Sequence, residues 1–160
     1  MRDGRIYVIY GQGGIITSGG MKLLANRIQA QWPKSIVTTH SWDDPNAIAA
    51  DMAHYPSFAK LLLGYSLGGN CVTWAAAAFK GTVDLAVCYD PSVLSIVTQP
   101  SANVKRLLLY HNTDIEPEGH AVFQGPQVET TQISMAHLAI CYSEMLHQKT
   151  LTAIGKCLSD

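Results

Sequence analysis

The stretch Leu61-Leu62-Leu63-Gly64-Tyr65-Ser66-Leu67-Gly68-Gly69-Asn70-Cys71-Val72-Thr73-Trp74 joins an apolar run to a helical pattern through a glycine-rich turn. Ser66 is the centre of a Gly-x-Ser-x-Gly sequence, which is the pattern of a nucleophile elbow. In such a turn the serine adopts strained backbone angles, and side chains two positions away on either side would collide. Gly64 and Gly68 avoid these collisions, so we expect the Ser66 hydroxyl to project from the edge of a sheet. A glycine-rich strand-to-helix turn without chemistry is the alternative interpretation.

Strand patterns alternate with helical patterns on both sides of this stretch. The apolar and β-branched runs predict strands at 5–10, 35–40, 59–63, 82–89, 104–110 and 127–133. Apolar residues at helical spacing predict helices at 21–32, 45–53, 67–79 and 136–158. Strands that alternate with helices form parallel sheets with both faces covered. The sequence therefore predicts an α/β fold, a three-layer sandwich with about six mostly parallel strands.

Composition is typical of a compact protein. Apolar residues make up 48% of the 160 residues and charged residues only 14%, which argues against disorder. A chain of this length supports one domain, so we assign residues 1–160 to a single domain. The net charge of −1 predicts no nucleic-acid partner.

Neither the apolar segments nor the cysteines indicate export or membrane insertion. No apolar run is long enough to span a membrane, and none precedes the first predicted strand, so we expect a cytoplasmic protein. The four cysteines fall inside apolar helix or strand patterns, which favours free thiols over disulfides. Oligomeric state cannot be predicted from these features.

The carboxyl ends of parallel strands meet at one edge of the sheet, where active sites lie. The polar residues that follow the predicted strands are the glycine-rich loop 11–14, Asp43, Asp44, Ser66, Asp90, Asp114 and His137. This set includes a nucleophile, several acids and a histidine. The loop 111–120 contains two histidines and three acids, but its spacing matches no known ligand pattern. We therefore predict a solvated acidic loop there, and neither a metal nor a cofactor.

These residues carry a resemblance to a known superfamily. The loop Tyr10-Gly11-Gln12-Gly13-Gly14, the elbow Gly64-Tyr65-Ser66-Leu67-Gly68-Gly69, an aspartate after the fifth strand and a histidine before the last helix resemble the α/β-hydrolase superfamily. The similarity is greatest to small, lidless bacterial lipases and esterases. Those enzymes carry a His-Gly-x-Gly loop, in which this chain has Tyr10 in place of the histidine. The resemblance implies a minimal α/β-hydrolase fold without a cap.

The resemblance also implies roles for individual residues. Ser66 would be the nucleophile and His137 the general base. Asp114 matches the usual position of the orienting acid, and its loop lies next to the strand that leads to His137. Asp90, at the end of the preceding strand, is the alternative that some relatives use. The backbone amides of Leu67 and Gln12 would form the oxyanion hole.

The expected function is hydrolysis of carboxylic esters through an acyl-enzyme. Only 14 residues, 90–103, separate the fourth and fifth strands, too few for a helical cap, so the predicted site is open to small acyl esters or thioesters. Apolar residues predicted to line an acyl groove are Ile15, Ile16, Leu67, Val93, Leu94 and Leu138. Two other classes remain open: a thioesterase or amidase that uses the same triad, and a non-catalytic binding protein with this fold.

Overall fold

One parallel sheet forms the centre of the computed structural model, which describes residues 1–92, 99–114 and 123–160. Within these residues the sheet has six strands in the order β2-β1-β3-β4-β5-β6. Every neighbouring pair is parallel. The strands are β1 (Gly4–Ile9), β2 (Ile36–His40), β3 (Ala59–Tyr65), β4 (Leu85–Tyr89), β5 (Leu107–Asn112) and β6 (Val128–Ile133). The predicted parallel sheet is confirmed.

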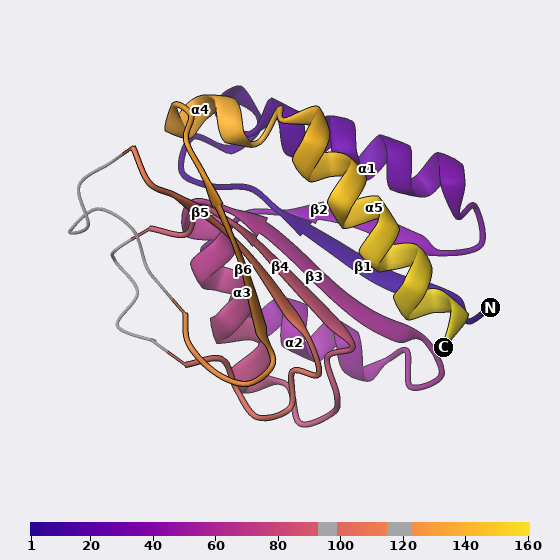
Figure 1. Ribbon diagram of the computed structural model, residues 1–160. Coiled ribbons are helices and arrows are strands. Elements are labelled where there is room, and N and C mark those ends of the chain that lie inside the picture. The colour runs from indigo at the N-terminus through magenta and orange to yellow at the C-terminus, as the bar shows by residue number, and fades with distance from the viewer. Residues whose placement is uncertain (93–98, 115–122) are drawn as a thin grey trace.

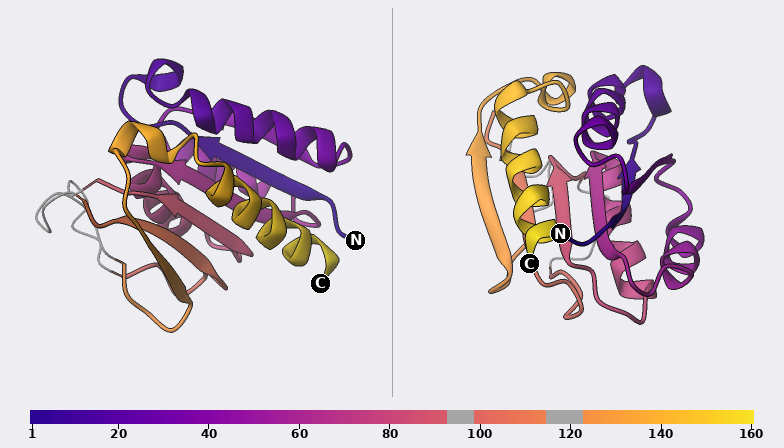
Figure 2. Two further views of the ribbon diagram at one scale, coloured as in Figure 1. Left: turned by 45° about the horizontal axis from the view of Figure 1, so that its top comes forward. Right: turned by 90° about the vertical axis from the view of Figure 1, so that its right-hand side faces the viewer.

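Helices cover both faces of the sheet (Figures 1 and 2). They are η1 (Gly14–Ile16), α1 (Gly19–Gln31), α2 (Pro45–Ala53), α3 (Leu67–Ala78), α4 (His137–Ile140) and α5 (Glu144–Ser159). One buried cluster joins α1 and α5 to one face through residues such as Leu24 and Ile154. A second cluster joins α2 and α3 to the opposite face through residues such as Met52 and Val72. The predicted three-layer α/β architecture is therefore confirmed.

Strand β3 leads into the elbow and lies inside the sheet. It pairs with β1 on one side and β4 on the other, and each of its seven residues is buried. A strand covered on both faces must be apolar along its whole length rather than alternate, which explains the run Leu61-Leu62-Leu63. The elbow is thus anchored in the most buried part of the molecule.

The prediction of one long helix over 136–158 is wrong. The chain instead forms the single turn α4 and then α5, with a break between Cys141 and Ser143. The Ser143 side chain caps α5 by accepting a hydrogen bond from the Leu146 amide at 3.4 Å. The buried ring of His147 donates through Nε2 to the Cys141 carbonyl at 2.8 Å. These bonds satisfy backbone groups at the break, and a helical pattern alone does not reveal them.

The break also brings α1 against the end of α4. A Cβ atom added to Gly20 would lie 1.9 Å from the Cys141 carbonyl oxygen, so only glycine allows this approach. Two strands are shorter at their starts than predicted, because β4 begins at Leu85 and β5 at Leu107. Among the helices in the described part of the chain, none has the length and apolar character needed to cross a membrane.

Candidate active site

Ser66 occupies the sharp turn between β3 and α3. Its backbone angles are φ 55° and ψ −124°, a region that residues other than glycine rarely adopt. A Cβ added to Gly64 would lie 2.1 Å from the Gly68 carbonyl oxygen, and one added to Gly68 would lie 2.3 Å from the Ile9 carbonyl oxygen. Both glycines are therefore required by the turn. The Ser66 amide donates to the Tyr89 carbonyl at 2.9 Å and ties the elbow to β4.

His137 begins α4 and lies against the serine. Its Nε2 is 3.1 Å from the Ser66 Oγ, and its Nδ1 is 2.5 Å from Oδ2 of Asp90. The imidazole is 29% exposed, whereas the Asp90 side chain is fully buried. A buried carboxylate, an imidazole and a hydroxyl are thus joined in one relay.

The carboxylate that contacts His137 belongs to Asp90, so the preference for Asp114 is corrected. The exposed Asp114 carboxylate accepts a hydrogen bond from the Ser134 hydroxyl at 2.5 Å. The expectation used the closeness of β5 to β6, the strand that precedes His137. The imidazole itself, however, stacks on Tyr65 at the end of β3. It lies over β3 and its neighbour β4, and Asp90 follows β4.

Contacts from α3 hold the segment that carries Asp90. The Asp90 amide donates to the Tyr110 carbonyl at 2.8 Å, and its φ of 46° turns the chain at the strand end. The buried side chain of Asn70 donates through Nδ2 to the Ser92 carbonyl at 2.7 Å. The Asn70 Oδ1 accepts from the Ser92 amide at 2.8 Å. The helix that begins at the nucleophile therefore also fixes the chain beside the acid.

The glycine-rich loop after β1 lies beside the nucleophile. A Cβ added to Gly11 would lie 2.9 Å from the Ser66 Cβ. The Gly11 amide donates to the buried Ser18 Oγ at 3.0 Å, and the Thr17 hydroxyl donates to the Gln12 carbonyl. Neither Ser18 nor Thr17 is among the predicted site residues, because the only signal in the sequence is that hydroxyl residues follow the glycines. They hold the loop in a chain that has Tyr10 in place of the family histidine.

Two amides near Ser66 are suited to bind an oxyanion. Leu67 is the first residue of α3, and the first amides of a helix have no partner within the helix. They also lie at the positive end of the helix dipole. Gln12 directly follows Gly11, and the described residues offer no hydrogen-bond acceptor to its amide. Leu67 and Gln12 thus stay as the proposed donors.

The apolar residues predicted for an acyl groove have different environments. Ile16 is 88% exposed on η1, Leu138 is 60% exposed on α4, and Ile15 is 55% exposed. Leu67 is buried in the elbow. Val93 and Leu94 lie outside the described residues, as does most of the acidic loop 111–120. Exposed apolar side chains therefore come directly after the glycine-rich loop and directly after His137 in the chain.

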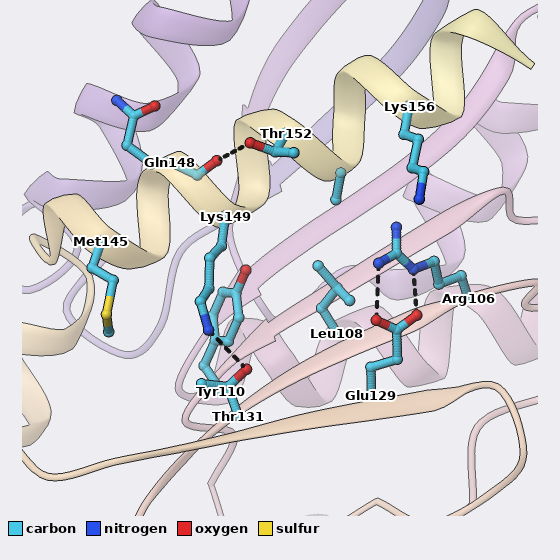
Figure 3. Close-up of a pocket in the computed structure, with 11 residues that line it drawn as sticks. Arg106, Leu108, Tyr110, Glu129, Thr131, Met145, Gln148, Lys149, Thr152 and Lys156 are labelled. Atoms are coloured by element: carbon cyan, nitrogen blue, oxygen red, sulfur yellow. Dashed lines mark hydrogen bonds and ion pairs between the residues drawn. The ribbon is translucent and has the colours of Figure 1, made fainter.

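A separate groove lies between α5 and the strands β5 and β6 (Figure 3). Its volume is about 520 Å³, and none of Ser66, Asp90 and His137 lines it. Arg106 lines it and forms a two-pronged ion pair with Glu129, at 2.5 and 2.9 Å. Lys149 points toward the Thr131 hydroxyl at 3.5 Å. These four side chains are thus engaged with one another, away from the relay.

One comparison with a solved structure agrees with this architecture. One solved structure, reported for the metagenome-derived lipolytic enzymes LipS and LipT, superposes with a TM-score of 0.62 at 14% identity. The superposition covers 97% of this chain and 95% of that one. A cutinase-like protein from Cryptococcus sp. has a TM-score of 0.49 at 12% identity, over 96% of this chain and 95% of its own. No family model and no curated protein matches the sequence. The chain has the α/β-hydrolase fold.

Proposed function

We propose that this protein is a serine hydrolase that cleaves carboxylic esters, with Ser66 as nucleophile, His137 as general base and Asp90 as the orienting acid. The observation that carries the proposal is the relay of contacts from Asp90 through His137 to Ser66, with distances of 2.5 and 3.1 Å. Nucleophile, base and orienting group within hydrogen-bond reach of one another are typical of an activated serine. The strained angles of Ser66 add support, because such strain is common at active sites.

The chemistry follows from the two contacts of the imidazole. Asp90 accepts a hydrogen bond from Nδ1–H, which leaves Nε2 free of its proton and able to accept the proton of Ser66. As Oγ bonds to the ester carbon, the carbonyl electron pair moves onto oxygen. When that pair returns, the bond to the alcohol breaks, and His137 gives its proton to the leaving oxygen. Water then repeats both steps on the acyl-enzyme and releases the acid.

The oxyanion would accept hydrogen bonds from the amides of Leu67 and Gln12. Removal of one such donor typically costs about 3 kcal/mol in the activation barrier. Correct placement of Gln12 depends on the loop that Ser18 holds through the Gly11 amide. The hydroxyl contacts of this loop are therefore needed to place the proposed oxyanion donor.

The substrate is proposed to be a small acyl ester whose acyl part meets the apolar side chains of Ile15, Ile16 and Leu138. These side chains are exposed. Ile15 and Ile16 belong to η1, and Leu138 belongs to α4. The lipolytic activity named for LipS and LipT agrees with this substrate class. Thioesters and amides would use the same relay, and a substrate panel separates them.

A serine-reactive fluorophosphonate probe tests the proposal. We expect labelling of Ser66 in the wild-type protein, identified by peptide mass spectrometry, together with turnover of a short p-nitrophenyl ester. Ser66→Ala should lose both signals and keep the fold, because alanine fits the elbow as well as serine does. Ser57→Ala, which changes an exposed serine before β3, should keep both. A folded wild-type protein without labelling or turnover would favour the non-catalytic alternative.

A further inference from the structure

The short helix α4 gives the candidate base little support of its own. It has only four residues, and its N-cap, Ala136, makes no side-chain cap bond. A single helical turn is only marginally stable without contacts from other elements. Its first residue is His137, so the position of the imidazole must be fixed by groups outside α4.

One side chain of the elbow contacts both the backbone and the ring of this histidine. The Tyr65 hydroxyl donates to the His137 carbonyl at 3.0 Å. The Tyr65 ring stacks on the imidazole, with 5.0 Å between the centroids and 29° between the planes. Tyr65 is 1% exposed and is the last residue of β3. The residue directly before the nucleophile therefore holds the base at two points.

These two contacts restrict the motions that would separate His137 from its partners. The hydroxyl bond fixes the backbone from which the side chain projects, and the stacked ring limits rotation of the imidazole. Because Tyr65 and Ser66 are joined by a trans peptide bond, their Cα atoms stay about 3.8 Å apart. Burial raises the pKa of the Tyr65 phenol above its ordinary value of 10, so the hydroxyl stays a donor at neutral pH.

Another contact holds the chain before the histidine but leaves its ring unrestrained. The buried Asn112 side chain donates through Nδ2 to the Met135 carbonyl at 2.8 Å. This bond fixes the path of the chain two residues earlier. The stacked ring of Tyr65 acts on the imidazole itself, in addition to the contacts of its two nitrogens with Ser66 and Asp90.

We infer that Tyr65 is a positioning residue for the reaction: it holds His137 so that its two ring nitrogens reach Ser66 and Asp90 together. The aromatic face of Tyr65 also lies against the imidazolium that forms when the proton leaves Ser66, an arrangement that favours the charged ring. This inference rests on the proposed function. It adds a role for the second residue of the Gly-x-Ser-x-Gly sequence, which acts through its contacts with His137.

Three variants test this role. Tyr65→Phe keeps the ring and loses the carbonyl bond, whereas Tyr65→Leu loses both contacts. Tyr110→Phe is the matched control. It removes a buried hydroxyl that bonds to Thr150 on α5 at 3.0 Å, and it keeps the Tyr110 backbone carbonyl that accepts from the Asp90 amide. The kcat and KM for a p-nitrophenyl ester and the melting temperature are measured for each.

For Tyr65→Phe we expect kcat to fall about 10-fold with KM unchanged, and for Tyr65→Leu about 100-fold, a loss typical of a misplaced catalytic group. Tyr110→Phe should lose melting temperature but keep kcat. The downfield proton NMR signal of the His137 Nδ1–H should persist in Tyr110→Phe and broaden in Tyr65→Leu. A folded Tyr65→Leu protein with wild-type kcat would overturn the inference. If that variant does not fold, wild-type kcat in Tyr65→Phe overturns it, and an inactive wild-type protein instead contradicts the proposed function.

Discussion

The Nδ1 atom of His137 lies 2.5 Å from Oδ2 of Asp90, a residue 47 positions earlier that directly follows β4, the neighbour of β3. The Asp90 side chain is fully buried, and the imidazole is partly exposed. In a site of this kind the acid sets the tautomer of the imidazole and stabilises its charged form. The position of the acid therefore decides which nitrogen faces Ser66.

Replacement of the two candidate acids distinguishes between them. Asp90→Asn should lower kcat by about 10⁴, because the amide keeps the shape but favours the wrong tautomer. Asparagine tolerates the positive φ of position 90, so the backbone should be retained. Asp114→Asn is the control: its carboxylate contacts the exposed Ser134 hydroxyl, and we expect activity near that of the wild type. The reverse order of the two activities in folded proteins would contradict the assignment. Ester turnover and circular dichroism provide both measurements.

The elbow could be predicted because its signals are local. A strand between two others must be apolar, and the turn demands glycine where Gly64 and Gly68 stand. His137 could be singled out by its order in the chain, since it begins α4, the first helix after β6.

The carboxylate that contacts His137 could not be identified from the sequence, because its position depends on which strand the imidazole crosses. That crossing is set by the contact of His137 with Tyr65, which links residues 72 positions apart. The break before α5 and the path of the loop at Gly11 depend on bonds between side chains and backbone groups that lie six and seven residues apart. Hydroxyl and amide residues are too common for their spacing to reveal such bonds.

The loop that carries Gln12 should depend on the hydroxyl of Ser18. Ser18→Ala removes the acceptor of the Gly11 amide and leaves a buried donor unpaired, which typically costs about 1–3 kcal/mol of stability. We also expect kcat to fall about 10-fold or more, because the loop is proposed to supply an oxyanion donor.

Ser35→Ala is the matched control for this change. Its Oγ accepts from the Gly4 amide at 2.9 Å, at the opposite end of β1. The control should lose similar stability, measured by urea unfolding, and retain kcat. Equal kcat in the two variants would show that the loop does not act in turnover.

Acid should destabilise the fold partly through Asp84. Burial alone would raise the pKa of its carboxyl, but hydrogen bonds from the Lys105 ammonium and the Lys60 amide, at 2.8 and 2.9 Å, lower it below the ordinary 3.8. A lowered pKa stabilises the folded state above the ordinary value, and this contribution is lost as pH falls through the folded-state pKa. The difference in unfolding free energy between wild type and Asp84→Asn should therefore be constant well above the ordinary aspartate pKa of 3.8. It should shrink as the pH falls below that value. Urea unfolding between about pH 7 and pH 2, a range that spans the titration of carboxylates, measures this difference. A difference that stays constant over the whole range would contradict the role of Asp84.

Two asparagines, Asn70 in the first turn of α3 and Asn103 against its last turn, test how Asp90 is held. At its start, the Asn70 side chain exchanges two hydrogen bonds with the backbone of Ser92, two residues beyond Asp90. Beyond its end, the Asn103 Nδ2 donates to the carbonyls of Ala76, Phe79 and Gly81, at 2.9, 2.9 and 2.8 Å. Both side chains therefore satisfy backbone groups, but only Asn70 lies beside the relay.

Asn70→Ala and Asn103→Ala should both lower the unfolding free energy by about 1–3 kcal/mol, because each leaves backbone groups without their partner. We expect kcat to fall about 10-fold in Asn70→Ala alone, since loss of its bonds frees the chain beside Asp90 and lets the carboxylate move away from His137. KM should stay the same in both, because neither asparagine belongs to the apolar surface of Ile15, Ile16 and Leu138. Equal losses of kcat in the two variants, at equal loss of stability, would mean that activity follows stability. Asn70 would then have no specific role in positioning Asp90.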